Sequence, residues 1–155
     1  MKANLEKTTV KDIAHLIKST CLRAPGDTSL DRLADLLCSS DRYKVYLEDG
    51  DGRLNGVIQA KQIAMKVLEL ARQKDDEEAM LPAIAYVMNS HCGQDLAEPP
   101  VAVRGDTPLK DVLGLMDQNH IREIAVVDED RRLVGTLEAK NILSHYLRAK
   151  AEANL

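Results

Sequence analysis

Aromatic residues are scarce in this sequence, which has four Tyr, no Phe and no Trp. The core must therefore be aliphatic, and the stacking platforms that bind single-stranded nucleic acid are largely missing. The sequence also lacks a dense stripe of Lys and Arg, and its formal net charge is −4. Proteins that bind the phosphate backbone present a basic face, so we expect no nucleic-acid partner.

Paired cysteines and long apolar runs are also absent. Cys21, Cys38 and Cys92 are odd in number and form no C-x-x-C pair, which predicts reduced thiols in the cytoplasm. No apolar run approaches the roughly 20 residues that cross a bilayer, and the N-terminus has no apolar segment of a signal peptide. We therefore expect no membrane insertion and a cytoplasmic location.

No catalytic or metal-binding motif is visible. The sequence contains no Walker, G-x-G-x-x-G or G-x-S-x-G pattern, and its Asp/Glu pairs fall on turns and solvated faces. The run Asp49–Arg53 faintly resembles a calcium loop but has Ala60 where a bidentate Glu is needed. The histidines at 15, 120 and 145 are widely spaced, which favours solvated or capping roles. We predict neither enzyme activity nor a metal site.

What the sequence does contain is an internal repeat, in which residues 26–68 align with residues 105–147 without a gap. Gly26-Asp27-Thr28-Ser29-Leu30 aligns with Gly105-Asp106-Thr107-Pro108-Leu109. The register then holds through a second turn and into a helix start, with identities at Asp49, Asp51, Arg53, Leu54, Gly56, Ala60, Lys61 and Ile63. The repeat predicts two copies of one structural unit.

Each copy predicts the order helix, strand, turn, strand, helix. The first helix is expected to have Asp27/Thr28 or Asp106/Thr107 as N-caps, with Pro108 near its first position. Its apolar face is Leu30, Leu33, Leu36 and Leu37 in the first copy and Leu109, Val112, Leu113 and Met116 in the second. The expected strands are 44–47 and 54–58, then 101–103, 123–127 and 133–137, and the second helices open at residues 60 and 139.

Three segments lie outside the repeat. Residues 9–18 and 82–90 are expected to be amphipathic helices, the second of them stopped by Gly93, and the acidic run 75–78 is expected to be a solvated linker. We therefore divide the chain into a first unit with an N-terminal helix at 1–72, a helical linker at 73–94 and a second unit at 95–155.

The order of these motifs resembles the CBS domain, which usually occurs as a tandem pair called a Bateman module. The matching segments are Val10-Lys11-Asp12-Ile13, Ala125-Val126-Val127-Asp128 with Gly135-Thr136-Leu137-Glu138-Ala139-Lys140-Asn141-Ile142, and Tyr46-Leu47-Glu48-Asp49 with Gly56-Val57-Ile58-Gln59-Ala60-Lys61-Gln62-Ile63. The resemblance implies an α+β fold of two pseudo-symmetric units, each a short sheet with two helices. It also implies sheet-to-sheet packing with two clefts, extra helices at the N-terminus and between the units, and a homodimer.

In nucleotide-binding members of this family, a Thr or Ser after the return strand contacts phosphate, and an Asp or Asn three residues later binds the ribose. The resemblance places Asn141 at the ribose position, but Glu138 replaces the hydroxyl, and a carboxylate there repels phosphate. Arg122 either contacts a phosphate or pairs with Glu138. The remaining predicted ligand-binding residues are Val103, Ile124 and Ala125 in the second copy and Tyr46, Gln59 and Gln62 in the first.

Two functions remain open. In one, the chain is a non-catalytic sensor that requires no cofactor, binds AMP, ATP or S-adenosylmethionine, and regulates an effector protein in trans. In the other, it is a ligand-free dimeric scaffold. The ligand-binding positions differ between the copies, so if only one copy binds a nucleotide, we expect it to be the second.

Overall fold

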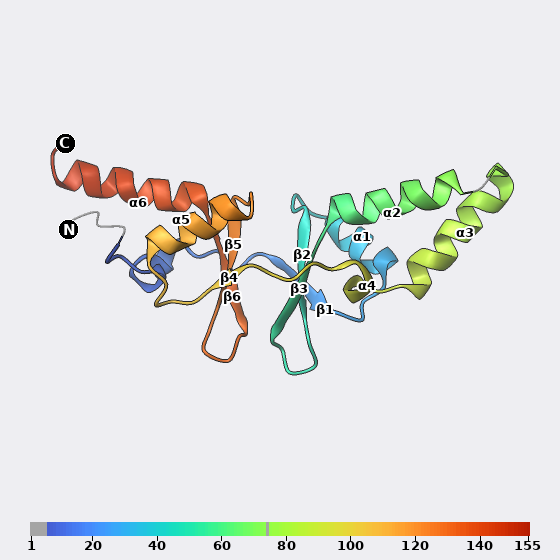
Figure 1. Ribbon diagram of the computed structural model, residues 1–155, viewed down its shortest axis with the longest axis horizontal. Coiled ribbons are helices and arrows are strands. Elements are labelled where there is room, and N and C mark those ends of the chain that lie inside the picture. The colour runs from blue at the N-terminus through green and yellow to red at the C-terminus, as the bar shows by residue number, and fades with distance from the viewer. Residues whose placement is uncertain (1–5, 74) are drawn as a thin grey trace. The chain divides into compact units, whose positions relative to one another are not determined.

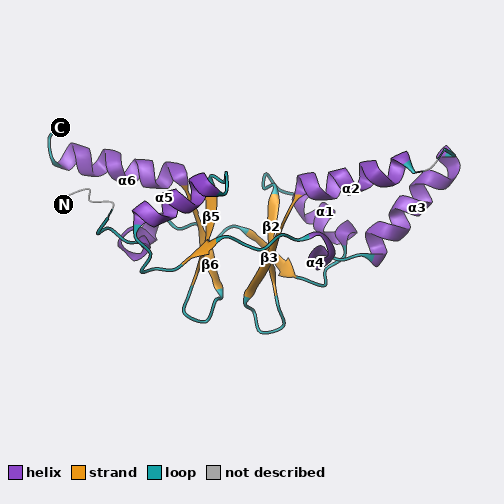
Figure 2. Ribbon diagram, viewed as in Figure 1, coloured by secondary structure: helices purple, strands orange, loops and turns teal. Residues whose placement is uncertain are grey.

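The computed structural model describes residues 6–73 and 75–155, which form two compact units (Figure 1). The first-copy unit is Cys21–Pro100. The second-copy unit combines the described residues up to Thr20 with Val101–Leu155. Each unit has a three-stranded sheet with helices on one side of it, which confirms the predicted α+β class (Figure 2).

The first-copy unit has strand order β1-β2-β3, in which β1 and β2 are parallel and β2 and β3 form an antiparallel hairpin. Its elements are β1 (Leu22–Pro25), α1 (Leu30–Cys38), β2 (Lys44–Glu48), β3 (Leu54–Gln59), α2 (Ala60–Arg72), α3 (Glu77–Ser90) and α4 (Gly93–Leu96).

The second-copy unit repeats this topology with strand order β4-β5-β6. Its elements are the 3₁₀ helix η1 (Val10–Leu16), β4 (Ala102–Val103), α5 (Leu109–Gln118), β5 (Glu123–Val127), β6 (Leu133–Glu138) and α6 (Ala139–Glu152). Val45 pairs with Ile58 and Ile124 pairs with Leu137, so the two hairpins share one register. The predicted repeat is confirmed.

Each unit has its own aliphatic core between the sheet and the helices. In the first-copy unit the fully buried members include Leu30, Leu33, Val45 and Ile58. Their counterparts in the second-copy unit are Leu109, Val112, Ile124 and Leu137. These are the apolar positions that the helical and strand periodicities predict, and strand alternation places Ala125 and Thr136 on the face away from the helices.

The segments that precede the two copies are exchanged between the units. The 3₁₀ helix η1 precedes the first copy, yet Val10 and Ile13 are buried in the core of the second-copy unit. The backbone of Lys18 exchanges hydrogen bonds of 2.9 and 2.8 Å with Thr136 of β6. Reciprocally, Glu98 precedes the second copy and exchanges two 3.0 Å bonds with Val57 of β3.

A glycine in β6 and another in β3 allow the preceding segments to lie close to these strands. A side chain at Gly135 would overlap the carbonyl of Lys18 and the side chain of Ile17, and one at Gly56 would meet Ala97 Cβ at 3.1 Å. The units in the structure thus differ from the predicted division at 1–72, 73–94 and 95–155. The segments around Lys18 and Glu98 could not be assigned to their units from the sequence, because backbone pairing beside a glycine produces no apolar periodicity in the paired segment.

Several predicted helix ends are wrong by a few residues. The helices α1 and α5 begin after Ser29 and Pro108, not at the Asp-Thr pairs, and the backbone N–H of Arg32 donates to Ser29 Oγ at 3.2 Å. The acidic run 75–78 is not a simple linker, because Asp76 caps α3 and accepts a bond from the N–H of Glu78 at 2.9 Å. Gly93 opens α4 and does not stop α3.

Candidate functional site

The start of α6 carries the two residues that the sequence places at a ribose and a phosphate. Glu138 is the N-cap, and its backbone N–H donates to Oδ1 of Asn141 at 2.8 Å. Among the described residues, Nδ2 of Asn141 has no hydrogen-bond partner. The cap therefore fixes the orientation of the Asn141 amide and leaves its donor nitrogen for a ligand.

The charge of Glu138 is compensated by two lysines. Its Oε1 lies 3.6 Å from Lys18 Nζ and its Oε2 lies 3.5 Å from Lys140 Nζ. Glu123, which is 8% exposed, is its direct partner on the neighbouring strand, and like charges in that arrangement destabilise a sheet. The lysines reduce this repulsion, and Lys18 is a residue that sequence reasoning missed, because it belongs to the exchanged segment.

The remaining predicted residues of the second copy lie on both sides of the sheet. The carbonyl of Arg122 accepts a 2.9 Å bond from the N–H of Ala139, which places Arg122 beside the first turn of α6. The side chains of Val103 and Ile124 are buried in the core, so only their backbones remain for a ligand. Ala125 faces away from the helices and is paired with Thr136.

The equivalent residues of the first-copy unit are already occupied. The N–H of Gln59 donates to Oε1 of Gln62 at 2.7 Å, as in the second copy. Nε2 of Gln62, however, donates to the carbonyl of Leu96 at 2.9 Å and thereby holds the α4 segment. Tyr46 lies in β2, with Lys44 Nζ 5.7 Å from the centre of its ring. The amide of Gln62 therefore has a structural role that the amide of Asn141 lacks.

Comparison with known proteins identifies the fold. Residues 93–148 match the family model "CBS domain". The crystal structure of the CBS-pair protein CBSX2 from Arabidopsis thaliana superimposes with a TM-score of 0.68, at 25% identity over 92% of this chain and 96% of that one. The chain has the fold of a tandem CBS pair.

Two further proteins are similar to this chain. A CBS domain-containing protein from Thermotoga maritima has a TM-score of 0.65, at 26% identity over 92% of this CBS pair and 96% of that chain. A curated relative is an uncharacterized 33.4 kDa protein in a ribosomal RNA operon of Thermofilum pendens, 32% identical over 122 residues. The matched region is 75% of this chain and only 40% of that relative's length.

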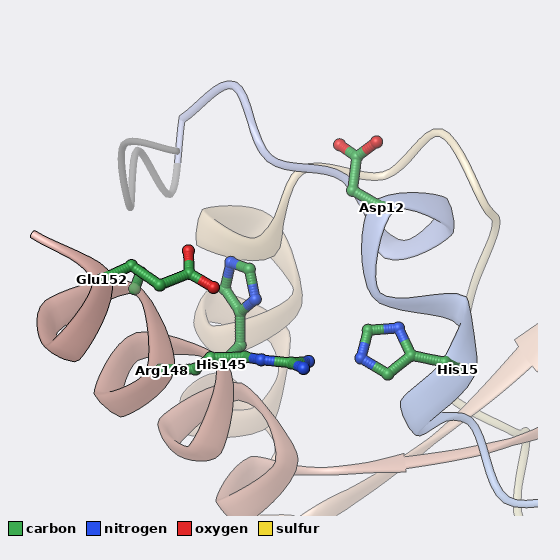
Figure 3. Close-up of a pocket in the computed structure, with 6 residues that line it drawn as sticks. Asp12, His15, His145, Arg148 and Glu152 are labelled. Carbon is green, nitrogen blue, oxygen red and sulfur yellow. The ribbon is translucent and has the colours of Figure 1, made fainter.

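A separate pocket of about 100 Å³ lies between η1 and α6 of the CBS pair (Figure 3). It is lined by Asp12, His15, His145, Arg148, Ala149 and Glu152. His145 is 9% exposed and its Nε2 has no hydrogen-bond partner among the described residues. The expectation of a solvated or capping histidine is therefore wrong for His145, because η1 covers this part of α6 only through the exchange.

Asp12 has a capping role at the edge of this pocket. Its Oδ2 accepts bonds from the backbone N–H of Thr9 at 2.9 Å and from the Thr9 hydroxyl at 3.1 Å. These bonds, the backbone one first, lower the pKa of Asp12. Within residues 6–73 and 75–155, no three His, Cys, Asp or Glu side chains are arranged to hold a metal ion, and no helix is long and apolar enough to cross a membrane.

Proposed function

We propose that this CBS pair is a non-catalytic regulatory module of the cytoplasm, which binds an adenine nucleotide at the start of α6 and modulates a partner protein in trans. One observation carries the proposal: the Asn141 amide is oriented by the cap, keeps its donor nitrogen unused, and lies in the same helix turn as the Lys140 ammonium. The three unpaired cysteines, Cys21, Cys38 and Cys92, support a reducing compartment.

Different groups at the start of α6 bind the ribose and the phosphate in this proposal. Asn141 Nδ2 donates to a ribose oxygen, while the positive end of α6, a helix of 14 residues, attracts the phosphate. Lys18 and Lys140 then exchange part of their pairing with Glu138 for the phosphate oxygens. The backbone of Arg122 also lies beside this helix start.

The ligand class is supported by what is bound to other proteins of similar fold. CBSX2 has been crystallised with AMP, the cytosolic domain of the Mg²⁺ channel MgtE with ATP, and the CBS pair of MJ0100 with 5′-methylthioadenosine and S-adenosyl-L-methionine. All four ligands contain adenine joined to a ribose ring, so this adenosyl end is the feature that we assign to the site.

The proposed assembly is a homodimer. Leu143, Tyr146 and Leu147 are each about half exposed on α6 and follow the i, i+3, i+4 spacing of one helix face. Contiguous apolar surface of this kind marks protein–protein contacts. In the alternative function, this dimer is a scaffold and the start of α6 binds nothing.

Calorimetric titration with AMP, ATP, S-adenosylmethionine and adenosine tests the proposal. The parent is expected to saturate with at least one of them, and Asn141→Ala is expected to weaken that binding roughly tenfold. Asn141→Asp keeps an acceptor for the cap and can accept from ribose hydroxyls, so it should retain more adenosine affinity than Asn141→Ala. Gln62→Ala is the matched control in the other copy and should bind as the parent does.

The alternative outcome is equally clear. If none of the four compounds binds or raises the melting temperature at millimolar concentration, the nucleotide proposal is wrong and the scaffold is favoured, because a saturating ligand must stabilise the state that it binds. Loss of binding in Gln62→Ala but not in Asn141→Ala would place the site in the first-copy unit and contradict the assignment to α6.

A further inference from the structure

The pocket between η1 and α6 gathers three nitrogen-bearing side chains from two elements. His15 comes from η1, and His145 and Arg148 come from α6, with the Arg148 guanidinium extending toward His15 (Figure 3). The pocket is not part of the proposed nucleotide site, whose residues lie in the first turn of α6. No group placed in that site contributes to its lining.

His145 is the least explained polar residue of the second-copy unit. It is more than nine-tenths buried, and its Nε2 has no partner. A buried polar atom without a hydrogen bond costs about 1–3 kcal/mol, so native proteins rarely leave one unsatisfied. Because His145 lines the pocket, a molecule bound there would satisfy it.

Charge indicates the nature of that molecule. Arg148 is exposed and, among the described residues, has neither an ion pair nor a hydrogen bond. Of the two carboxylates in the lining, Asp12 already accepts two bonds from Thr9. Glu152 is exposed on the last turn of α6 and extends toward His145, but it makes no ion pair or hydrogen bond among the described residues (Figure 3). The Arg148 guanidinium can only donate, and each imidazole can donate from one of its ring nitrogens, so the unused nitrogen groups of the lining can present donors to an oxyanion.

The size of the pocket limits the oxyanion to a small one. A volume of about 100 Å³ is well below the roughly 300 Å³ at which pockets for drug-sized ligands begin. A whole nucleotide is excluded on this ground, whereas a tetrahedral ion is not.

The repeat supplies an internal comparison. The repeat alignment places Lys66 opposite His145, and its extension one residue beyond the matched segment places Glu69 opposite Arg148. Lys66 Nζ lies 3.6 Å from Glu69 Oε1, so the first copy pairs these two positions with each other. The second copy replaces that ion pair with two residues that have no such mutual pairing. We propose that His15, His145 and Arg148 form a binding site for inorganic phosphate.

The experiment is a titration of ¹⁵N-labelled protein with sodium phosphate at pH 7 and constant ionic strength, with sodium chloride as the control salt. We expect saturable shifts of the amide signals of residues 12–15 and 145–149, with chloride producing none. Arg148→Met, an exposed position that should not disturb folding, is expected to weaken phosphate binding roughly tenfold. Glu152→Gln removes a repulsive carboxylate and is expected to strengthen it.

Three results would overturn the proposal: no saturation with phosphate, the same shifts with chloride, or unchanged binding in Arg148→Met. His145→Gln serves as a second variant because it keeps an amide donor, and it should bind more weakly than the parent but more strongly than His145→Ala. If phosphate shifts residues 138–141 instead, this proposal fails while the proposed nucleotide site gains support. If AMP fails to bind but phosphate shifts the signals of residues 12–15 and 145–149, the phosphate site stands and the nucleotide proposal loses support.

Discussion

Asn141 and Gln62 occupy the same position of the repeat and make the same bond, since the side-chain carbonyl of each accepts the backbone N–H three residues earlier, at 2.8 and 2.7 Å. They differ in the other half of the amide. Gln62 Nε2 donates to the carbonyl of Leu96 at 2.9 Å, and Asn141 Nδ2 donates to no described residue. One helix start is therefore braced by its own chain, and the other is open to a ligand.

The first prediction concerns stability at these two positions. Gln62→Ala removes the cap bond and the bond to Leu96, whereas Asn141→Ala removes only the cap bond. We expect a loss of about 2 kcal/mol in the free energy of unfolding for Gln62→Ala and about 1 kcal/mol for Asn141→Ala. Urea denaturation of the ligand-free protein measures both, and equal losses would contradict the bracing role of Gln62.

The second prediction compares the two glycines that admit the exchanged segments. In Gly135→Ala the new methyl meets the backbone of Lys18, which cannot move without breaking its pairing with Thr136. We expect about 2–3 kcal/mol of destabilisation and faster hydrogen exchange at the Lys18 and Thr136 amides. Gly56→Ala meets the side chain of Ala97 at 3.1 Å and should cost about 1 kcal/mol or less. A larger destabilisation in Gly56→Ala than in Gly135→Ala would contradict this account of the exchange.

The pairing beside these glycines is the part of the fold that could not be predicted from the sequence. The repeat, the hairpin register and the aliphatic cores could be predicted because strands and helices impose periodicities of 2 and 3.6 on nearby residues. The pairing of Lys18 with Thr136 could not, because the two residues are far apart in sequence and the pairing uses backbone atoms. Lys18 beside Glu138 and His145 beneath η1 both depend on that pairing, so sequence reasoning placed Asn141 at a helix start but missed Lys18 and the pocket.

The third prediction is the pH dependence of the cap at η1. The bonds from Thr9 lower the pKa of Asp12 below its usual 3.8, so the ionised form stabilises the folded state above that pH. This stabilisation is lost as the pH falls through the lowered pKa of the folded state. Asp12→Asn should therefore flatten the dependence of the melting temperature on pH below about 4. Asp95 of the first-copy unit accepts a bond from the N–H of Cys92 at 2.9 Å, which lowers its pKa in the same way. Asp95→Asn should therefore have the same effect as Asp12→Asn.

Assembly through α6 is the fourth prediction. If the exposed face of Leu143, Tyr146 and Leu147 is the proposed dimer contact, then Leu147→Glu places a charge in an apolar interface and should shift the protein to monomer. Analytical ultracentrifugation measures the change. Leu81→Glu, at a 69% exposed position of α3, is the control and should leave the dimer intact. A parent protein that is already monomeric at all concentrations would refute the proposed homodimer.

The last prediction separates the two roles that Lys18 can have. If Lys18 only neutralises Glu138, then Lys18→Met lowers stability and changes the affinities for AMP and adenosine equally. If it also reaches the phosphate, as proposed, AMP affinity falls about two- to fivefold, the size of one exposed ion pair, while adenosine affinity is unchanged. The double variant Lys18→Met with Glu138→Gln separates the two roles, because it removes the repulsion between Glu138 and Glu123 together with the lysine. Because loss of the Glu138 carboxylate itself favours phosphate, calorimetry compares this double variant with Glu138→Gln alone. A lower AMP affinity in the double variant assigns Lys18 to the phosphate, and an equal affinity assigns it to charge compensation alone.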